Sequence, residues 1–157
     1  MPEGLYTLTL TVTDKAGRPL PGAVVTLEPT GPKLAVKPMN GVEISQKKKA
    51  FIPDVTVVTV GTPVTFPNLD TVRHHGYSFS PAKRFEIRLY KGTPSAPIVF
   101  DRSGIVALGC NVHDWMLAYV VVVDTTFFAK SGKDGVGHLV LQEGTHQWRS
   151  CDTGMRE

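Results

Sequence analysis

Cysteine is scarce in this chain, with two among 157 residues, so a framework of several disulfides is excluded and at most one bridge could form. Long apolar runs are missing too, because no stretch approaches the roughly 20 apolar residues of a membrane span. The first residues, Met1 to Gly4, lack the charged and apolar regions of a signal peptide. We therefore expect a soluble chain, from which an export signal would already have been removed.

A strong charge of either sign is also absent. The formal net charge is +3, and the one basic run, Lys47 to Lys49, has no interleaved aromatic residues and is typical of a solvated strand end or loop. Nucleic-acid binding is therefore not predicted. The length allows one domain with a real core, or one domain with a small appendage, and excludes a large multi-domain enzyme.

Glycine and proline are plentiful, with 15 and 12 residues, which indicates many turns rather than long helices. Apolar and polar residues alternate from Leu5 to Thr13, and this pattern predicts a strand. A second short strand is predicted from Ala23 to Leu27. We expect these two strands to form a hairpin-like pair with little core of its own.

Short strand patterns separated by glycine and proline turns continue from residue 41 to residue 108. The nearly unbroken apolar run Leu117 to Val123 predicts a central strand that is buried on both faces. Strands at this frequency favour an antiparallel sandwich or barrel. A further strand is predicted from His138 to Leu141, whereas Glu143 to Glu157 has no periodicity and its end is expected to be poorly ordered.

The residues with metal-binding chemistry lie in the segment Cys110 to Met116, which places a thiolate, the imidazole of His113 and a thioether three residues apart. With one more imidazole, these donors are the set that a mononuclear blue-copper centre requires. A short loop between two strands would hold them nearly fixed, so that the site rearranges little between Cu(I) and Cu(II). Because the thiol must lose its proton to bind, metal binding should depend on pH.

The upstream imidazole could come from His74 or His75, which are adjacent. Successive strand residues point to opposite faces, so one of the two at most can face a metal. Taken alone, either histidine would be interpreted as a surface or hydrogen-bonded residue, and the downstream cluster favours one of them as a ligand. The scattered His138 and His146 are interpreted as solvent-exposed polar residues.

Other metal centres fit the same segment less well. A structural zinc site normally recruits more cysteines or histidines and has little use for Met116. In multicopper oxidases the cysteine is typically flanked by histidines that reach a second copper cluster, whereas Gly109 and Asn111 stand here. A dinuclear copper centre would need a second cysteine nearer in sequence than Cys151.

A cysteine hydrolase is the remaining enzymatic interpretation, with Cys110 as nucleophile and His113 or His75 as base. No orienting third group is evident, and the spacing of three residues suits shared metal ligation. Met116 alone would be interpreted as core filler. Its spacing from Cys110 and His113 favours ligation instead.

The segment 50–68, which ends in Phe66, Pro67 and Asn68, resembles the approach to the first histidine ligand in the cupredoxins, the family of plastocyanin and amicyanin. Amicyanin-like proteins place this ligand six residues after an asparagine, with an acidic residue two residues after the same asparagine. Asn68, Asp70 and His74 match that spacing. The resemblance further implies that Asn68 braces the ligand loop and that the amide of His75 donates toward the cysteine sulfur. It implies four copper ligands: His74, Cys110, His113 and Met116.

The chain is more closely similar to the cupredoxin-like proteins labelled methylamine utilisation proteins. The shared motifs are Phe66-Pro67-Asn68, His74-His75, Tyr77 to Ser80, Leu89-Tyr90 and Leu108 to Met116. This resemblance implies an all-β, cupredoxin-like Greek-key β-sandwich over residues 42–125, with extra N- and C-terminal strands. Gly76 departs from the family pattern, in which a branched apolar residue is expected, and should loosen the strand beside the ligand.

The two ends resemble a carboxypeptidase regulatory-like β-domain, in Val12 to Asp14, Gly17 and Pro19 to Val25 at the start and in Phe128 to Leu141 later. The resemblance implies that residues 5–32 and 126–146 form a split β-module into which the cupredoxin is inserted, with 147–157 as a tail. The expected closing strand is not recognisable after Glu143. The first strands could therefore instead extend the cupredoxin.

These resemblances imply a type-1 copper protein that carries one electron between redox partners, such as a cytochrome or a dehydrogenase, in the bacterial periplasm, and that is not an enzyme. The alternative is a copper-binding or copper-storage module without redox turnover. We expect a weak docking face around His113, formed by Trp115 and Leu117. An acidic partner would be assisted by four basic residues: Lys83, Arg84, Arg88 and Lys91.

Overall fold

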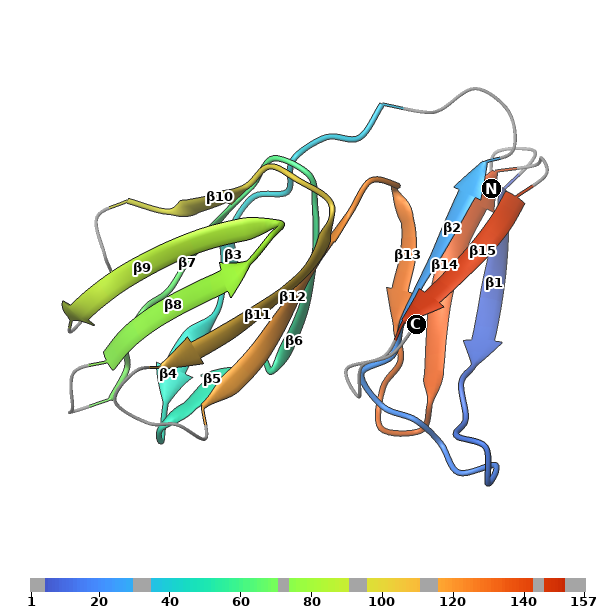
Figure 1. Cartoon of the computed structure of the whole chain (residues 1–157). Helices are drawn as coiled ribbons and strands as arrows, with labels where there is room; N and C mark the ends of the chain where they lie inside the picture. Colours follow the sequence, from blue (N-terminus) through green and yellow to red (C-terminus); the bar gives the residue numbers. More distant parts are fainter. Residues whose placement is uncertain are drawn as a thin grey trace. The chain divides into compact units, whose positions relative to one another are not determined.

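The computed structural model describes residues 5–29, 35–70, 74–90, 96–110, 116–142 and 146–151, and in strand ends such as His74 and His75 it describes the backbone alone. These residues divide into two compact units (Figure 1). One comprises residues 1–36 and 125–157, and the other comprises residues 37–124. The unit boundaries thus fall at 36/37 and 124/125, where the sequence had suggested a start at 42 and a join at 125/126.

The larger sheet of the unit 37–124 has five strands in the order β6-β12-β11-β8-β9. Its pairs are antiparallel except that β6 runs parallel to β12. As predicted, the apolar run Leu117–Val123 is a central strand, because it pairs with a neighbour on each side. The strands are β6 (Val55–Thr59), β8 (His74–Ser80), β9 (Lys83–Tyr90), β11 (Gly104–Cys110) and β12 (Leu117–Val123).

A smaller sheet of this unit has the order β10-β7-β3, and a separate hairpin joins β4 to β5. From the β8–β9 hairpin the chain passes to β10 in the smaller sheet and then returns to β11 beside β8 (Figure 1). This crossover between sheets is a Greek-key connection, so the predicted all-β, cupredoxin-like Greek-key fold is confirmed. The strands are β3 (Val42–Glu43), β4 (Ser45–Lys47), β5 (Ala50–Ile52), β7 (Thr62–Thr65) and β10 (Ile98–Phe100).

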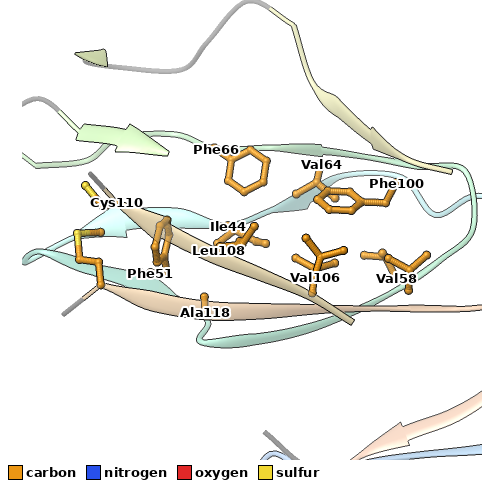
Figure 2. Close-up of a cluster of buried hydrophobic side chains, with 13 residues drawn as sticks. Ile44, Phe51, Val58, Val64, Phe66, Phe100, Val106, Leu108, Cys110 and Ala118 are labelled. Atoms are coloured by element: carbon orange, nitrogen blue, oxygen red, sulfur yellow. The ribbon is translucent and has the colours of Figure 1, made fainter. Parts of the chain in front are cut away.

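The core of this unit is a cluster of buried side chains contributed by both sheets. Alternation along β11 turns Val106, Leu108 and Cys110 inward, since side chains two residues apart on a strand share a face. Val64 and Phe100 come from the smaller sheet. Figure 2 shows this cluster with the sulfur of Cys110 at one end, so the apolar core continues up to the predicted copper ligand.

The other unit combines strands from both ends of the chain. Leu10, Leu27, Phe127 and Leu139 lie in its own buried cluster. β1 pairs with β14, and β2 lies between β13 and β15. The strands are β1 (Leu5–Thr11), β2 (Val24–Pro29), β13 (Phe127–Lys130), β14 (Val136–Gln142) and β15 (His146–Cys151).

Two expectations for this unit are wrong. The first two strands do not form a hairpin-like pair with little core, because each pairs with strands from the C-terminal part of the chain and both contribute to a buried cluster. The residues after Glu143 also contain a strand, since β15 pairs antiparallel with β2 from His146↔Pro29 to Cys151↔Val24. Residues 147–151 therefore belong to a strand and not to the predicted tail. Within those residues, no helix has the length and hydrophobicity needed to span a bilayer.

Candidate metal centre

Two of the four predicted ligands lie at the ends of adjacent strands. Cys110 is the last residue of β11, and Met116 comes directly before β12. The antiparallel register of these strands runs to Gly109↔Leu117, so the next positions outward are Cys110 and Met116. Each of the two sulfur side chains has 2% of its surface exposed and belongs to the same buried cluster. The fold thus brings a thiol and a thioether to one end of a core that excludes water.

Gly76 lies directly opposite Cys110 in the β11–β8 ladder. Gly76 is buried, yet among the described residues no atom lies within 4 Å of a Cβ built on it. Cross-strand neighbours share a face of the sheet, so the missing side chain leaves room on the inner face beside Cys110. A soft metal ion bound by sulfur ligands fits such a place, because the thiol and the thioether are both present and no side chain of residue 76 competes for the space.

The outer face at the same position is filled. Gly109 pairs with Tyr77, and a Cβ built on Gly109 would lie 2.7 Å from Cζ and from the hydroxyl oxygen of Tyr77. The Tyr77 ring therefore lies against the backbone of β11, and it also contacts the ring of Phe79 at a centroid distance of 5.1 Å. The two adjacent ladder positions thus differ. At Gly76 the described residues leave room on the inner face of the sheet, whereas at Gly109 the ring of Tyr77 fills the outer face.

The nitrogen ligands are only partly described. His74 begins β8 opposite Tyr90, two residues before Gly76. Between the pairs His74↔Tyr90 and Gly76↔Ile87, β8 has one residue and β9 has two, so the extra residue of this bulge belongs to β9. At Gly76 itself β8 is paired on both sides, so the expected loosening of this strand is not seen at Gly76.

The side chains of His74 and His75 lie outside the described part of the structure, as do residues 111–115 with His113 and Trp115. Their roles as ligands, as amide donor and as docking residue stay predictions. Among the described side chains, no three of the types His, Cys, Asp and Glu lie together as a metal group. The predicted set stays untested, because the side chains of both nitrogen ligands lie outside the described residues.

The segment before His74 is held by hydrogen bonds to β4. The amide of Gln46 donates to the carbonyl of Pro67 (2.8 Å), and the amide of Leu69 donates to the carbonyl of Gln46 (2.7 Å). Asn68 is buried, and its Oδ1 accepts from the amide of Asp70 at 3.0 Å. Asn68 thus stabilises the turn after β7, whereas its predicted contact with the ligand loop stays a prediction.

Sequence reasoning missed the part that Gln46 plays in this segment. Gln46 is fully buried in the hairpin strand β4 and forms an isolated parallel bridge with Asn68. A glutamine beside a run of three lysines gives no sequence signal of burial. Only its pairing with Pro67 and Leu69, about twenty residues later, identifies it as part of the candidate centre's support.

Two of the four expected basic docking residues, Lys83 and Arg84, do not lie beside the candidate centre. Leu117, with 54% of its surface exposed, follows Met116 and suits a docking face. Lys83, in contrast, pairs with Ser80, six residues along β8 from His74, which is about 20 Å at 3.3 Å per residue. Lys83 also forms an ion pair with Asp101 at 3.7 Å, and Arg84 pairs with Phe79 at the same end of the hairpin. Lys83 and Arg84 therefore lie away from the candidate centre, while the side chain of Arg88 and all of Lys91 are outside the described residues.

No family model matches the chain, and no curated protein matches it. Among solved structures, the chain is similar to a copper-containing nitrite reductase from Thermus scotoductus, at 22% identity with a TM-score of 0.49, over 62% of this chain and 25% of the reductase. A purple cupredoxin from Nitrosopumilus maritimus matches at 23% identity and TM-score 0.46, over 53% of this chain and 100% of its own.

An oxidised variant of amicyanin is similar at 20% identity and TM-score 0.46, over 52% of this chain and 81% of the amicyanin chain. The match to the nitrite reductase spans a quarter of that enzyme's length. Likeness at this level determines neither a function nor a ligand set. The assignment of the fold rests on the strand order and the Greek-key connection of the chain itself.

Proposed function

We propose that the chain is a type-1 copper protein of the cupredoxin kind, similar to the methylamine utilisation proteins, and that it carries one electron between protein partners. The observation that supports this most is the burial of Cys110 and Met116 together at adjacent strand ends, with Gly76 leaving room opposite the thiol. His74 and His113 complete the proposed ligand set.

The residues of the chain suit this task for a physical reason. A bound copper ion would supply one-electron redox chemistry. The β11–β12 ladder ends at Gly109↔Leu117, directly beside Cys110 and Met116, so the positions of the thiolate and the thioether should change little with the charge of the ion. The surrounding apolar cluster keeps water from the sulfur atoms, and a dry site with fixed donors needs little rearrangement when an electron arrives.

The position of His74 follows from the register of β8. Side chains two residues apart on a strand share a face, so we propose that the imidazole of His74 lies on the face that Gly76 and Cys110 share, and that His75 lies on the other. His113 would approach from the loop that joins β11 to β12.

Two other functions are less well supported. A reactive cysteine normally lies in a partially exposed, electropositive place, whereas Cys110 is buried in an apolar cluster, which argues against a hydrolase and against enzymatic use of the thiol. A copper store or copper carrier without redox turnover would use the same four ligands. We favour electron transfer because rigid strand ends suit a centre that keeps its geometry. We further propose periplasmic location, and a redox partner that docks near Leu117.

The decisive experiment adds Cu(II) to the apo-protein and follows visible absorption. We expect intense thiolate-to-copper absorption, with a blue or green colour, that disappears in Cys110→Ser and persists in the matched control Cys151→Ser. A colourless protein, or colour that survives Cys110→Ser, would contradict the proposal. Reversible voltammetry would then separate a carrier from a store, because a store would respond slowly or irreversibly.

A further inference from the structure

The β4–β5 hairpin turns through two lysines in a conformation that lysine rarely adopts. Lys48 and Lys49 have φ angles of 52° and 56°, both in the left-handed region. A two-residue turn with two positive φ values is a type I′ turn, which strongly favours Asn-Gly and similar pairs because a Cβ crowds the following carbonyl. Some interaction must therefore hold this turn in place against local preference.

A single carboxylate contacts the backbone of both residues. The amide of Lys48 donates to Oδ1 of Asp70 at 2.5 Å, and the amide of Lys49 donates to Oδ2 at 2.9 Å. Charge-assisted hydrogen bonds of this kind are about twice as strong as neutral ones. Asp70 is itself oriented, because its amide donates to Oδ1 of Asn68 at 3.0 Å.

The same carboxylate lies at the end of the segment that leads to the candidate centre. Pro67 and Leu69 are hydrogen-bonded to the two sides of Gln46 in β4. Asp70 adds hydrogen bonds to the Lys48–Lys49 turn that follows β4. It lies four residues before His74. The chain from Pro67 to Asp70 is thus joined to the β4–β5 hairpin at three successive points.

We infer that Asp70 is a positioning residue for the copper centre. Its carboxylate binds the two amides of the Lys48–Lys49 turn and so joins this turn to the segment 67–70; we call this pair of hydrogen bonds the clasp. The clasp fixes the point from which the chain continues toward His74 and β8. The inference rests on the proposed copper function for its consequence, although the clasp itself is a property of the apo-protein. Lys48 and Lys49 then contribute through their backbone amides, and this interaction does not depend on their side chains.

The first test compares Asp70→Ala with a matched control in the other unit. Asp14 makes the same kind of contact, because its Oδ1 accepts from the amides of Ala16 (2.9 Å) and Arg18 (3.0 Å). In the apo-protein we expect amide hydrogen exchange at Lys48, Lys49 and Leu69 to be at least about tenfold faster in Asp70→Ala and unchanged in Asp14→Ala. Unchanged exchange at Leu69 in Asp70→Ala would overturn the clasp.

The second test separates positioning from mere stabilisation of the turn. Copper affinity should fall by about tenfold in Asp70→Ala, with a changed thiolate-to-copper spectrum, and should stay unchanged in Asp14→Ala. Lys48→Asn with Lys49→Gly supplies the preferred type I′ pair, so adding both to Asp70→Ala should restore the turn and the melting temperature. The clasp between turn and segment stays broken, so copper affinity and spectrum should remain altered.

Each outcome is informative. If the Asn-Gly turn restored copper affinity along with melting temperature, Asp70 would merely stabilise a turn and the positioning role would be wrong. Wild-type copper affinity in Asp70→Ala would overturn it equally. If no variant bound copper, the wild type included, the proposed function would fail, and exchange at Leu69 would still decide whether the clasp exists.

Discussion

Cys110 and Gly76 lie opposite each other in the β11–β8 ladder, and the described residues leave the position of a side chain at residue 76 unfilled. One position along the ladder, Gly109 faces Tyr77, whose ring occupies the space that a Cβ would need. Two glycines on neighbouring strands therefore have opposite relations to their surroundings. On the inner face of the sheet, the candidate ligand Cys110 therefore lies beside a position without a side chain. On the outer face, the ring of Tyr77 covers the neighbouring residue Gly109.

Alanine at these two glycines should have opposite effects on stability. Gly76→Ala removes backbone freedom from the unfolded chain and its methyl group meets no described residue, so we expect unfolding to cost about 0.5–1 kcal/mol more. Gly109→Ala places a methyl group at 2.7 Å from the Tyr77 ring, and displacing that ring should cost about 1 kcal/mol or more. Urea midpoints of the apo-proteins measure both, and a lower midpoint for Gly76→Ala than for Gly109→Ala would contradict the packing described.

Met116 should show separate structural and metal-binding roles. Met116→Leu keeps the buried volume, so the apo-protein should lose less than about 1.5 kcal/mol, whereas Met116→Ala should lose about 2–5 kcal/mol. In the copper-loaded protein, Met116→Leu should keep the thiolate-to-copper colour and raise the reduction potential, because the lost thioether donor stabilises Cu(II) more than Cu(I). Voltammetry checks the potential. An unchanged potential would remove Met116 from the ligand set and leave it as a core residue.

Two phenylalanines offer a matched test of the core. Phe100 is fully buried and packs edge-on against Phe85 at a centroid distance of 6.1 Å, so Phe100→Ala should cost about 3–5 kcal/mol. Phe79 has 67% of its surface exposed and contacts mainly the Tyr77 ring, so Phe79→Ala should cost at most about 1 kcal/mol. Thermal denaturation of the two variants checks this order. Equal losses would mean that Phe100 is not a core residue.

The unit 37–124 should fold by itself. In the described part of the chain its ten strands pair with one another, and all residues of its buried cluster belong to this unit. We expect residues 37–124, produced separately, to unfold cooperatively and to bind Cu(II) with the colour of the full chain. A non-cooperative transition would show that the unit 37–124 needs the strands of the other unit in order to fold. Cys110→Ser in the separate unit supplies the control for the colour.

Part of the candidate centre was predictable from local pattern. The spacing of Cys110, His113 and Met116 specifies a donor set, and the apolar run after Met116 specifies a buried strand. The structure buries both candidate sulfur residues, Cys110 and Met116. Gly76 was noticed in the sequence as a departure from the family pattern, but its position opposite Cys110 depends on the register between β8 and β11. Register joins segments more than thirty residues apart, and no local pattern encodes it.

The sequence by itself determined most of the strand segments, their apolar faces and the side chains that can bind a soft metal. These properties are local, because alternation and donor chemistry belong to neighbouring residues. Only the tertiary structure decided that β1 pairs with β14, that an aperiodic C-terminal segment becomes β15 beside β2, and that Asp70 contacts a lysine turn about twenty residues earlier. Such contacts depend on matching surfaces and hydrogen-bonding groups that meet only after distant segments have folded together.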